Sequence, residues 1–448
     1  MFAGRDAARL EAVGLHLPGF NQGAAQPMPL KLQKPHLPQA VYWFTLVAFV
    51  LRIIARLHTG AADFWVNGYT FFFDMAQNIA AGKGIELGGA ATAFRVPLYP
   101  IFLAALTMGQ KAFWPILIAQ SAIGAGTAFC AALLARQMFH GPWAAKAATL
   151  AAAITAVYPY YVIHDTALEE TSLFTLLTLV AVLLLRQTVQ SSRLATAACA
   201  GLLLGLDVLT RATIAPFALL IPFWLVWQKR TRAGLACAFL LLLTVTPWLW
   251  RNYVLTGVPT LSTEAGEELW NGNNGFLFTH YPQESSDLSK AEALNALSIA
   301  DRQHLQQIGN NEELTNQWFL HKAIDYISTH PTQTVIDGFR KIAAAFYWLP
   351  SPRRGRFADL VYALSYEPVM LLGLWGMWRR RSQWREDAPI YALFVTFIMV
   401  TAAFWAHTSH LAYLVVYWIV FASGALAETG AGIAHRRAQQ GQSDLQRS

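Results

Sequence analysis

Carboxylates that could do acid–base chemistry gather in two short segments of an otherwise apolar chain. They are Asp63, Asp74 and Glu86 in the first segment, and Asp165, Glu169 and Glu170 in the second. A carboxylate can act as a general base toward a hydroxyl group or help to hold a divalent cation. Each acid also has an ordinary alternative, since loop acids are usually solvated and acids at a helix start complement the helix dipole. Glu170 lies closest to a long apolar run, so it is the costliest to bury without a purpose.

Arginines that could bind an anion also interrupt or flank apolar runs. They are Arg95, Arg211, Arg251, Arg353 and Arg354. A guanidinium group matches phosphate oxygens through paired hydrogen bonds and does not lose its charge. Arg211 has a structural alternative, because Asp207 lies one turn before it and charges inside a membrane often pair with each other. Together, the acids and arginines indicate a reaction on a phosphorylated ligand.

The composition places these residues in a membrane protein. Of the 448 residues, 55% are hydrophobic and only 13% are charged, about half the charged fraction of an average soluble domain. The net charge of +7 comes from short clusters at the ends of apolar runs, which argues against a nucleic-acid-binding face. Cys130, Cys199 and Cys237 lie inside apolar runs and match no metal or redox spacing, so they read as buried structural thiols.

Ten apolar runs are candidate membrane spans, each expected to need about 20 residues. They are 40–58, 113–137, 144–162, 169–187, 194–210, 212–229, 233–250, 359–378, 388–406 and 408–428. Basic clusters at alternate ends mark one side as cytoplasmic, and the candidate acids and arginines then fall on the outer side. The count of ten spans, with the basic clusters on the cytoplasmic side, holds only if Leu98–Met108 is an interfacial or re-entrant helix. This segment contains Pro100 and follows Pro97.

The expected fold is an all-α polytopic membrane protein, a bundle of about ten transmembrane helices with outer interfacial helices. Five segments are predicted: 1–39, a cytoplasmic N-terminal segment; 40–250, a transmembrane catalytic module with a first outer loop at 59–112; 251–358, an outer region; 359–428, C-terminal transmembrane helices; and 429–448, a cytoplasmic tail. Within the outer region, 335–350 is expected to be an interfacial helix with Arg340 and Lys341 on its polar face.

Several pieces, in this order, resemble bacterial membrane glycosyltransferases of family 39, relatives of protein O-mannosyltransferases and aminoarabinose transferases with a GT-C fold. They are Ala76–Gly84, Arg95–Ala104, Tyr158–Pro159 with Glu170–Phe174, Leu209–Arg211, and Pro247–Tyr253 with Gly272–Asn274. The sequence departs from the family at Gly68–Tyr69, where relatives usually have an acid. Asp74 or Asp63 is then the expected substitute.

The resemblance implies an inverting transfer of a sugar from a polyprenyl-phosphate donor to a lipid, glycan or protein acceptor. The reaction is expected outside a bacterial cytoplasmic membrane, in the periplasm. Charge placement and the resemblance together give the candidate residues. The candidate catalytic residues are Asp74, Asp63, Asp165 and Glu170, and the candidate binding residues are Arg95, Tyr99, Glu169, Arg211, Arg251, Asn252, Asn273, Arg353 and Arg354. A divalent cation, Mg²⁺ or Mn²⁺, stays open. The alternatives are a flippase or other transporter of lipid-linked glycans, and an inactive membrane scaffold.

Overall fold

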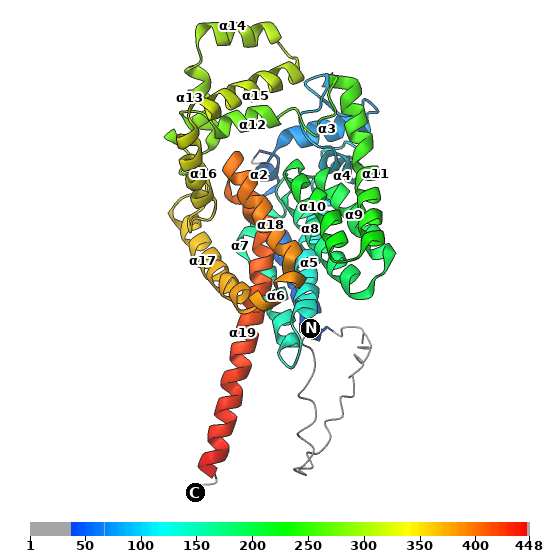
Figure 1. Ribbon diagram of the computed structural model, residues 1–448, viewed down its shortest axis with the longest axis vertical. Coiled ribbons are helices and arrows are strands. Elements are labelled where there is room, and N and C mark those ends of the chain that lie inside the picture. The colour runs from blue at the N-terminus through cyan, green and yellow to red at the C-terminus, as the bar shows by residue number, and fades with distance from the viewer. Residues whose placement is uncertain (1–36, 67, 446–448) are drawn as a thin grey trace, which may run out of the picture. The chain divides into compact units, whose positions relative to one another are not determined.

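The computed structural model describes residues 37–66 and 68–445, in which almost all regular structure is helical (Figure 1). The expected all-α fold is confirmed, because this part of the chain forms 19 α-helices and one short antiparallel hairpin of β1 (Glu86–Leu87) and β2 (Ala90–Ala91). Residues 1–36 of the predicted N-terminal segment lie outside the described residues.

The helices follow one another along the chain with short connections. The first are α1 (Gln39–Thr59), α2 (Ala61–Val66), α3 (Thr70–Ala80), α4 (Leu98–Thr107), α5 (Phe113–Met138), α6 (Ala144–Val157), α7 (Pro159–His164), α8 (Thr171–Ser191), α9 (Leu194–Val208), η1 (Ala212–Ile214), α10 (Ala215–Trp227) and α11 (Thr231–Thr256). The rest are α12 (Ala265–Gly272), η2 (Leu277–Thr279), α13 (Ser286–Asn295), α14 (Ile299–Ile308), α15 (Glu312–Thr329), α16 (Pro331–Ala345), α17 (Arg356–Arg379), η3 (Arg381–Gln383), α18 (Trp384–Ala403) and α19 (Thr408–Leu445).

Seven helices in the described residues are long and apolar enough to cross a membrane: α1, α5, α8, α11, α17, α18 with η3, and α19. The other three predicted spans fold as the shorter apolar helices α6, α9 and α10. The span predicted at 144–162 breaks at Tyr158, because Pro159 cannot continue the hydrogen-bond pattern of the preceding helix and instead starts α7. α4 has ten residues, about 15 Å of helix, which agrees with the expectation that it does not span.

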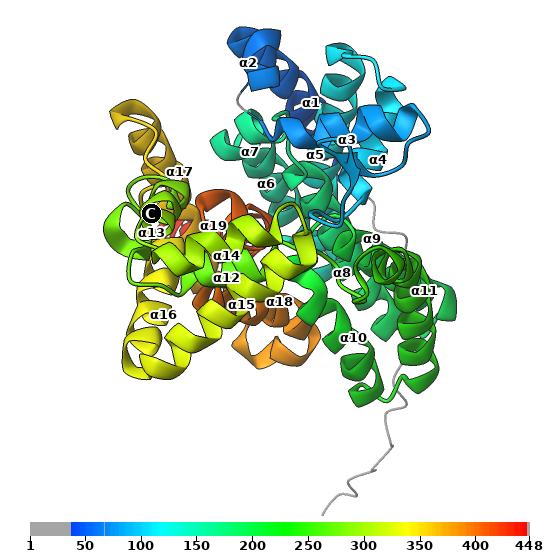
Figure 2. The same cartoon turned by 90° about the horizontal axis from the view of Figure 1, so that it is seen from above.

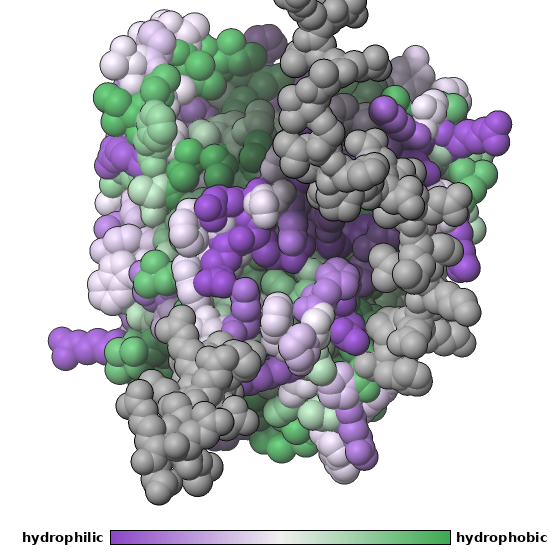
Figure 3. Space-filling view, turned by 60° about the horizontal axis from the view of Figure 1, so that its bottom comes forward, coloured by the Kyte–Doolittle hydropathy of each residue, from purple (hydrophilic) through white to green (hydrophobic). Residues whose placement is uncertain are grey.

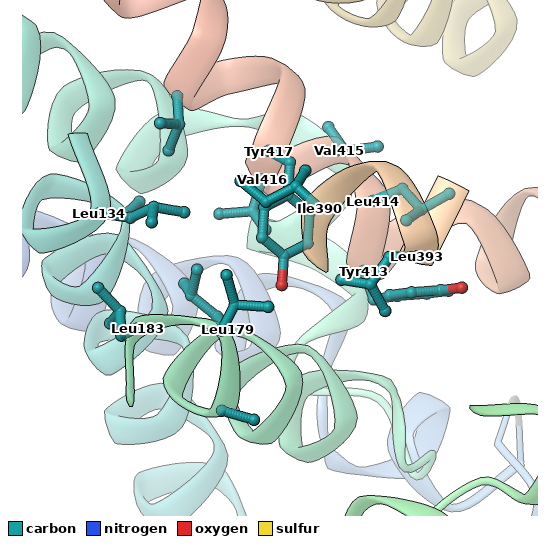
Figure 4. Close-up of a cluster of buried hydrophobic side chains, with 14 of the residues drawn as sticks. Leu134, Leu179, Leu183, Ile390, Leu393, Tyr413, Leu414, Val415, Val416 and Tyr417 are labelled. Atoms are coloured by element: carbon teal, nitrogen blue, oxygen red, sulfur yellow. The ribbon is translucent and has the colours of Figure 1, made fainter. Parts of the chain in front are cut away.

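The core of the bundle is built around α19. In its most apolar window, 89% of the residues are buried, and residues from Tyr413 to Tyr417 pack against Leu134 of α5, Leu179 of α8 and Leu393 of α18 (Figure 4). A helix that is apolar on all sides needs partners all round it. The helix continues to Leu445, through most of the segment predicted as a tail.

Small residues allow neighbouring helices to approach closely, as is common in membrane bundles. A Cβ atom added to Gly201 of α9 would lie 2.1 Å from the Cys237 carbonyl oxygen of α11, and one added to Gly376 of α17 would lie 2.3 Å from the Phe421 oxygen of α19. The glycines at these contacts therefore fix where α9 and α17 sit.

Helices α12 to α15 form a layer over the ends of α18 and α19 (Figures 1 and 2). α16 leads from this layer to α17 and is amphipathic, with Phe339 69% exposed. The expectation that Lys341 lies on its polar face is wrong: Lys341 is fully buried and donates to the Gly272 and Ala403 carbonyl oxygens at 3.0 and 3.3 Å. The ammonium group therefore ties α16 to α12 and α18.

At the end of the bundle away from this layer, a buried charge network, here called the Arg186 network, joins α8, α17 and α18. Arg186 Nη1 lies 2.6 Å from Asp387 Oδ1, and Arg380 Nε lies 2.9 Å from Asp387 Oδ2. Arg380 Nη1 also donates to the Met138 carbonyl oxygen of α5. Figure 3 looks toward this end and shows hydrophilic residues gathered in a recess. A cavity of about 460 Å³ is lined there by residues such as His140, Arg379 and Arg381.

Candidate active site

Glu170 and Arg211 form a buried ion pair at the start of α8. Glu170 immediately precedes that helix, and Arg211 lies in the extended link between α9 and η1. The Nε and Nη2 atoms of Arg211 lie 3.0 and 2.9 Å from Glu170 Oε1, and the two side chains are 13% and 7% exposed. Asp207, the structural alternative for Arg211, instead accepts a hydrogen bond from Thr178 Oγ1 at 2.7 Å.

Glu169 lies beside this pair, where the first loop meets the segment before α8. Its Oε1 atom is 3.6 Å from His164 Nδ1. Burial alone would raise the pKa of Glu169, but His164 and Arg211 hold that pKa below its ordinary value. The Tyr69 amide donates to the Leu168 carbonyl oxygen at 3.0 Å.

At Gly68, where the sequence departs from the family pattern, the backbone packs closely against Leu168. A Cβ atom added to Gly68 would lie 2.4 Å from the Cβ atom of Leu168. Real Cβ atoms essentially never approach that closely. The point at which relatives usually have an acid therefore has no room for a side chain in this chain.

A second ion pair joins Arg95, just before α4, to Glu264, just before α12. Arg95 Nη2 lies 2.6 Å from Glu264 Oε1, with the side chains 33% and 11% exposed. The Arg95 guanidinium also lies 5.4 Å from the centroid of the Phe71 ring, within the range of a cation–π interaction. Burial raises the pKa of Glu264 to about 8, even though Arg95 opposes the shift.

A set of hydrogen bonds fixes the two loops that carry this second pair. The Ser262 hydroxyl donates to the Phe94 carbonyl oxygen at 2.5 Å, and the Thr263 amide donates to the Ala93 oxygen at 3.0 Å. Glu312, at the start of α15, accepts from the Thr92 hydroxyl, the Ala93 amide and the Thr263 hydroxyl at 2.5, 2.9 and 3.0 Å. The layer of α12 to α15 thus clamps the first loop next to Arg95.

Arg251 belongs to this clamp. It was expected to bind substrate, but its Nη1 donates to the Thr92 carbonyl oxygen at 2.6 Å and its Nη2 to the Ile85 oxygen at 3.0 Å. Its neighbour Asn252 donates to the Thr260 oxygen at 2.8 Å. Both side chains therefore hold loop backbone in place, and neither forms an ion pair with the carboxylates described above.

Tyr69 and His410 connect the two ion pairs. Tyr69, 40% exposed, lies within electrostatic range of Glu170, Arg211 and Arg95. His410, near the start of α19, lies within electrostatic range of both Arg211 and Arg95. We call this set the Glu170 cluster; its members are Tyr69, Arg95, Glu169, Glu170, Arg211, Glu264 and His410.

Three polar atoms of the Glu170 cluster are buried and have no hydrogen-bond partner among the residues that the structure describes. They are Arg95 Nε, Glu169 Oε1 and Glu170 Oε2. Leaving a buried polar group unpaired costs about 1–3 kcal/mol, more when it is charged. The cluster therefore has both donor and acceptor capacity for a polar or ionic ligand.

The structure does not bring the other three acids expected to be catalytic into direct contact with this cluster. Asp165 lies 2.8 Å from the fully buried Arg52 of α1. Asp63 lies 2.9 Å from Arg56. Asp74 is exposed on α3, and the described residues form no hydrogen bond or ion pair with it.

The remaining predicted binding residues are spread over three places. Tyr99 is buried next to the cluster, where its hydroxyl accepts from Gln120 at 3.1 Å. Asn273 donates to the Leu269 and Ala403 carbonyl oxygens. Arg353 lies over the Tyr347 ring, and the exposed Arg354 follows it near α17. Tyr99 lies within electrostatic range of Glu170.

Sequence reasoning missed Glu264, Glu312 and His410. Glu264 stands in a run with Glu267 and Glu268 at the start of a helix, where acids commonly complement the dipole. Its partner lies far away in the chain, so no local spacing could single it out. His410 lies at the start of an apolar run and looks like an ordinary interfacial residue.

No group of three or more histidine, cysteine, aspartate or glutamate side chains that could hold a metal ion is found within the described ranges. The nearest approach to such a site in the Glu170 cluster is the pair Glu169 and Glu170, each with one unpartnered oxygen.

The fold and the site together define a multi-pass membrane protein with charged residues collected at one end of its bundle. Residues 95–250 match the family model described as dolichyl-phosphate-mannose-protein mannosyltransferase, which confirms the family resemblance over that segment. Over that segment the chain is similar to membrane glycosyltransferases that use a lipid-linked sugar donor. The match covers Arg95, Glu170 and Arg211 but not Glu264. No curated protein matches the chain.

Proposed function

We propose that this protein transfers a sugar from a polyprenyl-phosphate donor to a lipid, glycan or protein acceptor on the outer face of a bacterial cytoplasmic membrane, with inversion at the sugar C1 atom. The observation that carries the proposal is the Glu170 cluster: two arginine–glutamate pairs that both lie within electrostatic range of Tyr69, with buried donors and acceptors left over. Such a site can bind an anion and neutralise charge that develops on it.

In the proposed reaction the donor phosphate binds to Arg211. A guanidinium group already held in position by Glu170 needs little reorganisation to receive phosphate oxygens. The acceptor oxygen then attacks C1 from the side opposite the phosphate, and a single displacement of this kind inverts the configuration at that carbon.

The orientation of the chain is part of the proposal. Basic clusters gather at the Arg186 end, which the positive-inside rule assigns to the cytoplasm, so the Glu170 cluster would face the periplasm. Single cysteines in a cysteine-free variant test this, one at the exposed Ala90 and one at the exposed Ser382. A membrane-impermeant maleimide should label Ala90→Cys in intact spheroplasts and leave Ser382→Cys unlabelled; the reverse pattern would contradict the orientation.

A divalent cation is also proposed for the site. Glu170 Oε2 has no hydrogen-bond partner among the described residues, and Glu169 Oε1 has only the ion pair with His164 at 3.6 Å. These two oxygens suit Mg²⁺ or Mn²⁺, which usually bind one or two carboxylates together with substrate phosphate. Treatment with EDTA followed by dialysis should lower donor binding, and added Mg²⁺ or Mn²⁺ should restore it. Unchanged binding after EDTA would remove the cation from the proposal.

The function is tested with purified protein in proteoliposomes and radiolabelled undecaprenyl-phosphate sugars. Wild-type protein should cleave the sugar–phosphate bond of at least one donor, and Arg211→Gln should not. Arg381→Gln, an exposed arginine at the other end of the bundle, is the matched control and should behave like wild type. Movement of the donor across the bilayer without cleavage would support a flippase, and neither activity would support an inactive scaffold.

A further inference from the structure

Glu264 is held with one carboxylate oxygen fixed and the other accessible. Oε1 faces Arg95 Nη2 at 2.6 Å. No hydrogen bond to Oε2 is formed by any residue of the described ranges, and this atom is not among the fully buried unpartnered ones. With 11% of its side chain exposed, the carboxylate is oriented by one oxygen and can receive a proton on the other.

The backbone on both sides of this carboxylate is rigidly placed. The clamp formed by Ser262, Thr263 and Glu312 holds the Glu264 segment against the loop that carries Arg95. Five hydrogen bonds fix the two loops relative to each other, more than an ordinary surface ion pair between loops requires. Fixing a reactive group within a fraction of an ångström is what positioning for catalysis requires.

Glu264 is carried by a different part of the fold from the Glu170–Arg211 pair. Arg211 and Glu170 are carried by the ends of α9 and α8, inside the bundle, whereas Glu264 is carried by the segment that leads into the layer of α12 to α15. Tyr69 and His410 are near both ends of this arrangement. In a displacement with inversion, the group that activates the acceptor must lie across the sugar from the leaving phosphate.

We propose that Glu264 is the catalytic base that activates the acceptor hydroxyl, an inference that rests on the proposed function. The acceptor oxygen forms a bond to the sugar C1 atom while its proton passes to Glu264 Oε2. The bond between C1 and the phosphate oxygen breaks, and its electron pair leaves with the phosphate, where Arg211 stabilises the charge.

The raised pKa of Glu264, about 8, supports this role. A carboxylate with that pKa accepts a proton more readily than an ordinary glutamate, and it is ionised once the pH reaches about 8. Asp74, one of the two first-loop acids expected from the sequence as the base, is exposed, and none of the described residues forms a hydrogen bond or ion pair that would orient it.

The test compares Glu264→Gln with wild type on undecaprenyl-phosphate [14C]mannose in proteoliposomes, with water, ethanol and trifluoroethanol as acceptors. Glu264→Gln should lower kcat about 100- to 1,000-fold, while binding of undecaprenyl phosphate changes less than twofold. The wild-type rate should rise with pH and level off above about pH 8, and this limb should be absent in the variant. The loss should be smaller for trifluoroethanol, whose more acidic hydroxyl needs less help.

Asp325→Asn is the control, because Asp325 is an exposed acid of the same outer layer, on α15; it should keep the wild-type rate and pH limb. Glu267, Glu268 and Lys290 also act electrostatically on the Glu264 carboxylate, so they stay unchanged in these variants. A normal kcat and an intact pH limb in Glu264→Gln would overturn the inference, as would loss of that limb in Asp74→Asn. These results leave the proposed function standing as long as wild type cleaves the donor and Arg211→Gln does not.

A second measurement tests the role of Glu264 without any rate of turnover. In a structure of the wild-type protein with undecaprenyl-phosphate mannose bound, the sugar C1 atom should lie where one hydroxyl oxygen can reach both C1 and Glu264, roughly 3 Å from each. A C1 atom closer to Asp74 than to Glu264 would overturn it.

Discussion

Buried arginine–carboxylate pairs lie near both ends of α8, and the two ends differ in how their polar atoms are used. In the Arg186 network both oxygens of Asp387 are bonded, Oδ1 by Arg186 and Oδ2 by Arg380. In the Glu170 cluster, one oxygen of Glu170 is bonded by Arg211 and the other has no described partner. About 24 Å of helix separates the two arrangements.

The comparison separates buried charges that hold a fold together from buried charges that can receive a ligand. Asp387 neutralises two arginines and ties α8, α17 and α18 together, and both of its oxygens are used. Within the described residues, the Arg186 network has one unpartnered buried donor, Arg186 Nε, whereas the Glu170 cluster has two carboxylate oxygens without a hydrogen bond as well as Arg95 Nε. The Glu170 end therefore differs in its unused acceptors, whose burial costs free energy and which suit a ligand that brings a donor or a cation.

The largest effect is expected for the arginine that would meet the donor phosphate. Arg211→Gln combined with Glu170→Gln removes both charges of the pair, so neither is left buried alone. Transfer should fall about 1,000-fold while the melting temperature changes little. The measurement is label transfer from undecaprenyl-phosphate sugars alongside differential scanning fluorimetry. Wild-type transfer by the double variant would end the assignment of Arg211 to the phosphate.

In the Arg186 network we expect a large loss of stability with little loss of activity. Asp387→Asn removes the carboxylate that Arg186 and Arg380 share and leaves Arg186, among the described residues, only the 3.9 Å ion pair with the exposed Glu386, which should cost about 3–5 kcal/mol of folding free energy. The melting temperature should drop strongly, while the rate per folded molecule stays near that of wild type. A variant of normal stability but low turnover would show that the Arg186 network takes part in catalysis and is not purely structural.

An intermediate loss of transfer activity is expected when the hydrogen bonds that clamp the first loop are weakened. Glu312→Gln weakens the hydrogen bonds from Thr92, Ala93 and Thr263, so Arg95 and Glu264 should lose their fixed positions. We expect kcat/KM for transfer to fall about tenfold, since hydrogen bonds to charged groups contribute about 1.5–3 kcal/mol. Asp325→Asn, an exposed acid on the same helix, is the control and should have no effect.

The smallest effect is expected at the acid that the sequence alone favours. Asp74 is exposed and unpaired within the described residues, so Asp74→Asn should keep transfer within about twofold of wild type. Steady-state kinetics of Asp74→Asn and Glu264→Gln, measured side by side, would show which of the two carboxylates is needed for transfer. Loss of transfer in Asp74→Asn alone would return the base to the first loop.

Much of this organisation follows from the sequence. Apolar runs and basic clusters are enough to predict an all-α membrane protein, and the motif around Glu170 with the Leu209–Arg211 piece points to the two residues that form a buried pair. Local patterns work here because helix length and apolar content are properties of contiguous residues.

The rest could not be predicted, because it depends on contacts between distant segments. Glu264 looks like one more acid at a helix start until the clamp brings it to Arg95. Arg251 looks like a phosphate ligand until its guanidinium is seen bonding loop carbonyl oxygens. Lys341 shows the same limit, since its helix is amphipathic but the ammonium group is buried against α12 and α18.

The most direct test of the central idea is the fate of the sugar–phosphate bond in a donor presented to the pure protein. We expect wild-type proteoliposomes to release free undecaprenyl phosphate from labelled undecaprenyl-phosphate sugar, and the Arg211→Gln, Glu170→Gln double variant to release none while Asp387→Asn still does so per folded molecule. Intact donor after incubation with wild type, or equal release by the double variant, would contradict the account.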